Sequence, residues 1–141
     1  MTTTLPLAHF TIAFWCVLVA ALLPIVCAGL AKRGQMRTPP KDGGYDNNNP
    51  RAWLARQTGS SARANAAQAN CFEALPFFIG AVVIAHLLGA GQALLDTLAV
   101  VYIVLRIIYE ATYSADTDMA RSDVWAAAMR VNIANLIIGY S

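Results

Sequence analysis

Hydrophobic residues dominate four long stretches of this chain, and polar residues gather between them. The stretches cover residues 7–31, 63–89, 92–114 and 121–140. A helix needs roughly 20 apolar residues to cross a bilayer, so each stretch is long enough to do so. A loop rich in Pro, Gly and Asn occupies residues 32–62 and cannot propagate a helix along its whole length. The pattern predicts one domain, residues 1–141, that is an all-α integral membrane four-helix bundle.

The composition supports a membrane protein. Hydrophobic residues make up 57% of the 141 residues, charged residues make up 13%, and the mean hydropathy is +0.50. A soluble domain of this size carries more charge and less apolar surface. The net charge of +2 is too small to indicate a nucleic-acid partner, because such binding depends on many Lys and Arg contacts to phosphate.

The positive charges also predict an orientation. Seven of the ten Lys and Arg residues lie between positions 32 and 63, and none precedes position 32. Because cytoplasmic loops carry the excess of Lys and Arg, we expect the first loop in the cytoplasm and the N-terminus outside. The short loops between the later spans fit a bacterial inner membrane, and an internal eukaryotic membrane would give the same hydropathy.

The end of the first loop contains a helix-start signal. Asn49 suits the N-cap position and Pro50 the first helical position, so a helix is expected to begin there. Trp53 would then lie at the membrane interface. The sequence leaves open whether this helix continues into the second span or forms a separate interfacial helix.

One helical face of the second span is polar. Arg63, Asn70 and Glu73 are spaced at i, i+7 and i+10, with Gln68 beside them. A carboxylate and two amides are costly in hydrocarbon unless they meet partners. We therefore expect this face to lie against protein or a wet cavity.

A second polar face follows on the third span. Tyr102, Arg106, Tyr109 and Tyr113 are spaced at i, i+4, i+7 and i+11, and Arg121 opens the last span. With basic residues at the end of the first span, these faces predict a cationic pocket at the cytoplasmic side. Such a pocket suits a small anionic ligand whose carboxylates are bound by Arg, and the lipid side would admit an apolar co-substrate.

The reactive side chains do not form a familiar catalytic or metal motif. Cys16, Cys27 and Cys71 lie in or beside apolar segments without CxxC spacing, so they are expected to be reduced and buried. The sequence contains no nucleophile paired with a base and no His or Cys cluster at metal spacing. We expect no metal site, and any chemistry to be supplied by the ligand.

Three short motifs resemble those of the MAPEG family, the membrane-associated proteins in eicosanoid and glutathione metabolism, in a bacterial-type form. They are AlaGln-x-AsnCys-x-Glu-x-x-Pro at residues 67–76, Arg-x-x-Tyr-x-x-x-Tyr at residues 106–113, and Arg121 followed by Ser122. The resemblance implies a homotrimer that binds glutathione between neighbouring subunits at the cytoplasmic side. It also implies conjugation or peroxidase chemistry on a lipophilic electrophile.

The resemblance assigns roles to individual residues. Arg121 matches the arginine that holds the glutathione thiol as thiolate. The positions that match glutathione contacts are Lys32 or Arg33, Gln68, Asn70, Glu73, Arg106, Tyr109 and Tyr113. One contact departs from the family pattern, because an expected arginine is replaced by Ala66, and Arg63 is the residue that would substitute for it.

A different function fits the same sequence. A MAPEG-like membrane protein without catalytic activity, such as a small subunit of a larger membrane complex, would use the polar faces to hold its subunits together. Its small-residue faces, for example Ala126–Ala128, would let neighbouring helices approach closely.

Overall fold

The computed structural model describes residues 10–115 and 118–140, and this part of the chain is helical and contains no strand. Four long helices follow one another along the chain, and a short helix and two 3-10 turns accompany them. The elements are α1 (Ile12–Ala31), η1 (Pro40–Asp42), α2 (Pro50–Ala55), α3 (Gly59–Leu87), α4 (Gln92–Ala115), α5 (Asp118–Ile137) and η2 (Ile138–Tyr140).

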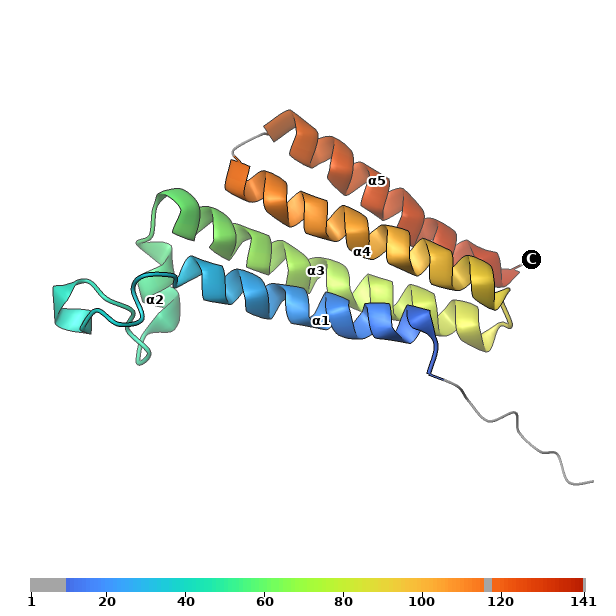
Figure 1. Cartoon of the computed structure of the whole chain (residues 1–141), viewed down its shortest axis with the longest axis horizontal. Coiled ribbons are helices and arrows are strands. Elements are labelled where there is room, and N and C mark those ends of the chain that lie inside the picture. The colour runs from blue at the N-terminus through green and yellow to red at the C-terminus, as the bar shows by residue number, and fades with distance from the viewer. Residues whose placement is uncertain (1–9, 116–117, 141) are drawn as a thin grey trace, which may run out of the picture.

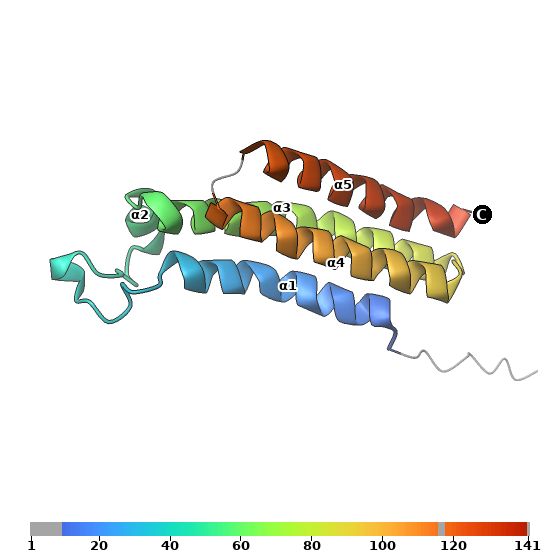
Figure 2. The same ribbon diagram turned by 45° about the horizontal axis from the view of Figure 1, so that its top comes forward.

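The long helices lie lengthwise beside one another (Figure 1). Helix α3 contacts α1, α4 and α5, and α4 packs against both α1 and α5. Figure 2 shows α3 and α4 in the middle, with α1 on one side and α5 on the other. The first loop, with α2, lies at the end of the molecule where α1 finishes and α3 begins.

The core between these helices is built from small residues and one aromatic stack. The ring of Phe78 on α3 stacks on Tyr102 of α4, with 4.1 Å between the ring centroids. Buried alanines, including Ala13, Ala85 and Ala99, bring the helix backbones close together. Many large apolar side chains face outward instead, which is the arrangement expected for helices that contact lipid.

Three helices in the described residues are long and apolar enough to cross a membrane. They are Ile12–Ala31, Gly59–Leu87 and the segment Gln92–Tyr113. Helix α5 carries four formal charges in its 20 residues, which lowers its mean hydropathy below that of the other three. The predicted fourth span, and the bundle of four membrane helices, therefore stay predictions.

The first helix begins later than the sequence pattern predicts. Residues 7–9 lie outside the described residues, and Phe10 and Thr11 are not helical. Thr11 is the N-cap instead, because its hydroxyl accepts a hydrogen bond from the Phe14 amide at 3.3 Å. The α1 backbone is also held from α4, since the Ala13 amide donates to Asp96 Oδ1 at 2.8 Å.

The loop before α3 adds detail to two predictions. Helix α2 begins at Pro50 with Asn49 at its N-cap position, as predicted, but the Asn49 side chain makes no capping hydrogen bond and its amide donates to Asp46 Oδ2. The position of Trp53 at a membrane interface stays a prediction, and its side chain does not project outward. It is buried in the loop, where its Nε1 donates to the Gly43 carbonyl at 3.3 Å and its ring packs on Tyr45.

The same loop answers the question left open about α2. Helix α2 ends at Ala55, and α3 begins at Gly59 as a separate helix that then runs without interruption to Leu87. Gly59 has a φ of +59°, a left-handed value that glycine adopts without strain. The second span therefore extends beyond its predicted start, and α2 is a separate element.

Candidate functional site

A buried ion pair lies where α1, α3 and α4 meet. Arg106 Nη2 donates to Glu110 Oε1 at 2.9 Å, one turn further along α4. Two thiols contact the same carboxylate, since Cys71 Sγ is 3.0 Å from Glu110 Oε1 and Cys27 Sγ is 3.5 Å from Glu110 Oε2. The guanidinium also reaches Cys71 Sγ at 3.6 Å. Glu110 therefore joins residues from three helices.

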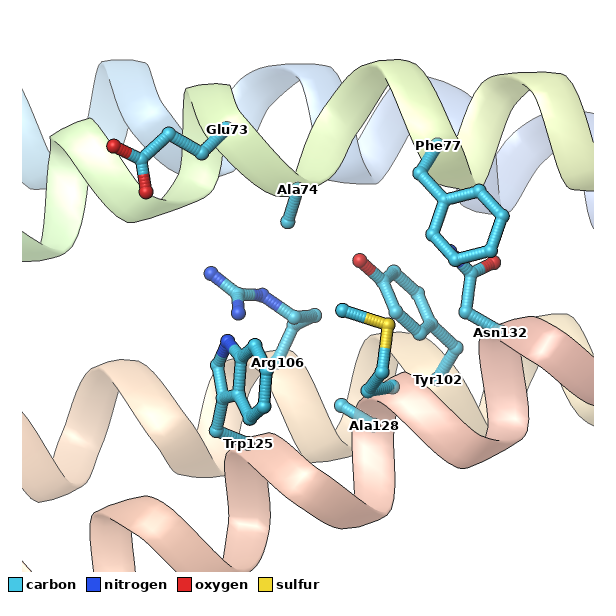
Figure 3. Close-up of a pocket in the computed structure, with 9 residues that line it drawn as sticks. Glu73, Ala74, Phe77, Tyr102, Arg106, Trp125, Ala128 and Asn132 are labelled. Carbon is cyan, nitrogen blue, oxygen red and sulfur yellow. The ribbon is translucent and has the colours of Figure 1, made fainter.

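A cavity of about 70 Å³ opens on the other side of Arg106, between α3, α4 and α5. Figure 3 shows the Arg106 guanidinium pointing from α4 toward α3, below Glu73 and Ala74. The walls of the cavity are mainly apolar, and the polar residues that line it are Glu73, Tyr102, Arg106, Trp125 and Asn132. The cavity thus combines a cation and a carboxylate with an apolar wall.

Stacked aromatic and cationic groups extend from Arg106 toward the start of α5. Arg106 Cζ lies 4.6 Å from the ring centre of Tyr109, and the Tyr109 hydroxyl is 3.5 Å from that of Tyr113. Arg121 Cζ lies 4.8 Å from the ring centre of Tyr113. Tyr109, Arg121, Ser122 and Trp125 line a second recess of about 240 Å³. Because Trp125 lines both the cavity and this recess, the two adjoin.

The polar face of α3 contains atoms whose hydrogen-bonding capacity is not used. Arg63 Nε, Gln68 Oε1 and Asn70 Oδ1 are buried and have no hydrogen-bond partner among the described residues. A buried polar atom without a partner costs roughly 1–3 kcal/mol, so native structures rarely keep such atoms. These three predicted site residues therefore have capacity for a ligand or a neighbouring chain.

Not all predicted site residues come together within one chain. Glu73 and Arg106 line the cavity, and Tyr109 and Arg121 line the adjoining recess. Lys32 and Arg33 line a separate recess beside the loop, where Lys32 Nζ stacks 4.4 Å from the Tyr45 ring centre. That recess shares no lining residue with the other two.

The structure adds site residues that the sequence patterns did not single out. Glu110 pairs with Arg106, and its i+4 spacing from that arginine was the available signal. Trp125 and Asn132 line the cavity from α5. Nothing in the sequence marks Trp125, whereas Asn132 is a polar residue inside an apolar stretch and is expected to face another helix or a cavity. The prediction that the three cysteines are free and buried is confirmed, yet their spacing gave no sign that Cys27 and Cys71 meet.

The comparison with protein families matches residues 12–140 to the MAPEG family, which is nearly the whole chain. The chain belongs to the MAPEG family. The comparisons with curated proteins and with solved structures each found no match. MAPEG proteins include glutathione-dependent enzymes as well as members without catalytic activity, and they commonly use glutathione. Membership thus accounts for the apolar helices and leaves this chain's own activity to be argued from its site.

Proposed function

We propose that this MAPEG protein is a membrane-embedded glutathione transferase or peroxidase that acts on lipophilic electrophiles. In this proposal it works as a homotrimer in a bacterial inner membrane, with the first loop in the cytoplasm. Glutathione is its co-substrate and lies between neighbouring subunits at the cytoplasmic side. Arg121 is the catalytic residue, and the contacts to the peptide come from α3, α4 and the end of α1.

The observation that carries the proposal is the set of buried, unpartnered atoms on α3. Gln68 Oε1 and Asn70 Oδ1 are acceptors, and Arg63 Nε is a donor. Glutathione offers amide and ammonium donors and carboxylate acceptors, so it supplies both kinds of partner. Arg63 takes the part that the family gives to an arginine at the position of Ala66.

The cavity supports the same ligand class. Arg106 brings a fixed positive charge to a largely apolar pocket, and arginine binds carboxylates through two parallel hydrogen bonds. Glu73 lies across the cavity from it and suits the ammonium group of a peptide (Figure 3). Apolar side chains from α3 and α5 complete the wall, as an electrophile arriving from the bilayer requires.

Exposed charges on the helices support assembly with other copies. Glu73 on α3 and Arg130 on α5 are both exposed in the single chain, well inside their helices. Charged groups at membrane depth face protein or water rather than lipid, because their desolvation is costly. A neighbouring subunit would cover these groups and complete the sites that one chain leaves divided.

The proposed chemistry belongs to the thiol of glutathione. A guanidinium near the thiol lowers the thiol pKa and raises the thiolate fraction at neutral pH. In conjugation the thiolate forms a bond to carbon and the leaving group departs. In peroxide reduction two glutathione thiols are oxidised to the disulfide while the hydroperoxide becomes an alcohol and water. Arg121 serves both reactions, and it lines the recess of about 240 Å³ together with Tyr109 and Ser122.

Turnover of a model lipophilic electrophile by detergent-purified protein tests the proposal. Arg121→Ala is expected to lower the rate of conjugation by about 10²–10³ near neutral pH while the trimer survives on gel filtration. Arg51→Ala removes an exposed arginine of α2 and is the matched control, expected to keep full activity. Equal turnover of Arg121→Ala and wild type would contradict the proposal.

One observation favours a second function, that of a non-catalytic MAPEG protein or a small subunit of a larger membrane complex. Arg106 already pairs with Glu110 of its own chain, so part of its capacity for carboxylates is used. On this second reading the buried charges hold the fold together and no thiol compound binds. Absence of both conjugation and thermal protection by glutathione would favour it.

A further inference from the structure

Cys27, Cys71 and Glu110 form a cluster of potential metal ligands that neither the fold nor glutathione binding requires. Their three potential ligand atoms come from α1, α3 and α4 and all lie within 4.8 Å of one another. Cys27 and Cys71 are each 4% exposed, and both are free thiols. We propose that these residues bind a zinc-like divalent metal ion, contrary to the expectation from sequence spacing.

The distances suit such an ion. With Zn–S bonds of about 2.3 Å and Zn–O bonds of about 2.0–2.2 Å, tetrahedral ligand atoms lie roughly 3.5–3.8 Å apart. The Cys71 Sγ to Glu110 Oε1 distance is 3.0 Å and the Cys27 Sγ to Glu110 Oε2 distance is 3.5 Å. Shifts of less than about 1 Å therefore convert the hydrogen-bonded cluster into three metal ligands.

The charges balance when the ion enters. Binding exchanges one divalent cation for the two thiol protons, which pass to bulk water. Two thiolates, the Glu110 carboxylate, the Arg106 guanidinium and the ion then sum to zero net charge. The Arg106–Glu110 ion pair with two protonated thiols also sums to zero net charge, so the exchange leaves the charge of the site unchanged. A neutral exchange avoids the cost of a net charge in a low-dielectric interior.

Arg106 fits this site as a supporting group. Its Nη2 lies 3.6 Å from Cys71 Sγ and 2.9 Å from Glu110 Oε1, so it hydrogen-bonds two of the three ligands. Groups that hydrogen-bond metal ligands fix their orientation and tune the metal. The pair of thiolates selects a borderline or soft ion such as Zn²⁺ over Mg²⁺ or Ca²⁺, which prefer oxygen ligands.

The structure leaves room for a fourth ligand beside the cluster. A cavity of about 10 Å³, lined by Cys71 and Arg106, adjoins the cluster. This volume is about that of one water probe, so a single water fits as the fourth ligand. Cys27 lies four residues before the end of α1, so it is about 6 Å along the helix from the first loop.

Metal content of the full chain, purified in detergent, tests the inference. Protein incubated with Zn²⁺ and washed with a weak chelator should retain one zinc per chain. Cys27→Ser and Cys71→Ser should each lower the retained zinc at least tenfold. Cys16→Ser is the matched control, because Cys16 is another free and buried cysteine of α1 outside the cluster, and it should retain zinc as wild type does.

A spectroscopic measurement keeps the test decisive if a serine variant folds poorly. Wild type loaded with Co²⁺ should show the sulfur-to-cobalt charge-transfer band, and Glu110→Gln, which preserves both thiols, should shift or weaken it. Zinc retained equally by all variants, or a cobalt spectrum without sulfur coordination, would overturn the inference. The result does not depend on the proposed transferase activity, since neither readout uses glutathione.

Discussion

Arg106 and Glu110 form a 2.9 Å salt bridge one turn apart on α4, with side chains only 4% and 13% exposed. Removing one partner of such a buried pair leaves the other charge unpaired, which lowers the free energy of unfolding by about 3–5 kcal/mol. Replacing both partners with apolar residues removes both desolvation costs and is often close to neutral. Removing one partner should therefore destabilise the protein more than replacing both.

Glu110→Gln should lower the free energy of unfolding by about 3 kcal/mol, because Arg106 keeps its charge and loses its carboxylate. The double variant Arg106→Met/Glu110→Leu should lose less than the single variant. Denaturant unfolding in detergent measures both, and Asp123→Asn, at an exposed position of α5, should change little. A double variant less stable than Glu110→Gln would show that the pair contributes more than its charges.

Substitution of Asn135 should raise the free energy of unfolding, whereas Glu110→Gln should lower it. Asn135 is 0% exposed, and both polar atoms of its amide lack hydrogen-bond partners among the described residues. Neither lipid nor a second subunit reaches a side chain buried within its own chain. Asn135→Leu keeps a similar volume and removes the unpaired amide, so it should raise the free energy of unfolding by about 1 kcal/mol.

Thermal unfolding of Asn135→Leu in detergent measures this gain. Asn132→Leu is the comparison, because Asn132 lines the cavity and its amide is available to a ligand there. A lower midpoint for Asn135→Leu than for wild type would mean that an internal water or another group satisfies the amide.

Gly44 in the first loop has no room for a side chain. A Cβ at this position would collide with the backbone carbonyl groups of Thr38 and Pro39. Gly44→Ala should therefore open the loop around buried Trp53 and speed trypsin cleavage there. Gly91→Ala, where nothing lies within 4 Å of the added Cβ, should leave cleavage unchanged. Equal cleavage rates for the two variants would contradict the tight loop.

Arg121 makes a prediction about pH. If its guanidinium stabilises the bound thiolate, Arg121→Ala raises the thiol pKa and moves the rise of the rate with pH to higher pH. Loss of such electrostatic stabilisation costs about 10²–10³ in rate near neutral pH. Arg121→Lys keeps a charge and should recover part of the loss. A pH–rate profile that does not move in Arg121→Ala would show that this residue acts through structure alone.

Much of the helical structure is predictable from the sequence, because a long apolar stretch between polar loops has few alternatives to a helix. The helices and the polar faces of α3 and α4 follow from spacing along single helices, and the resemblance to the MAPEG family rests on short motifs. Contacts between helices do not. The sequence gives no distance between Cys27 and Cys71, and Glu110 acquires its role only when α1 and α3 pack against α4. The burial of Trp53 was not predictable for the same reason, since the loop folds over it.

If glutathione binds the unpartnered atoms of α3, as proposed, substitution of Asn70 should weaken its binding. Asn70 Oδ1 is buried and makes no hydrogen bond among the described residues, so Asn70→Leu removes a ligand contact without breaking a bond that the structure shows. The measurement is the thermal midpoint of purified protein at increasing millimolar glutathione, beside Asn65→Leu on the same helix as control.

A ligand that binds only the folded protein stabilises it by about 2.7 kcal/mol at 100 times its Kd. Glutathione should raise the midpoint of wild type and of Asn65→Leu with the logarithm of its concentration, and should raise that of Asn70→Leu much less. A midpoint that does not respond to glutathione in wild type, or that responds equally in Asn70→Leu, would contradict the proposed binding.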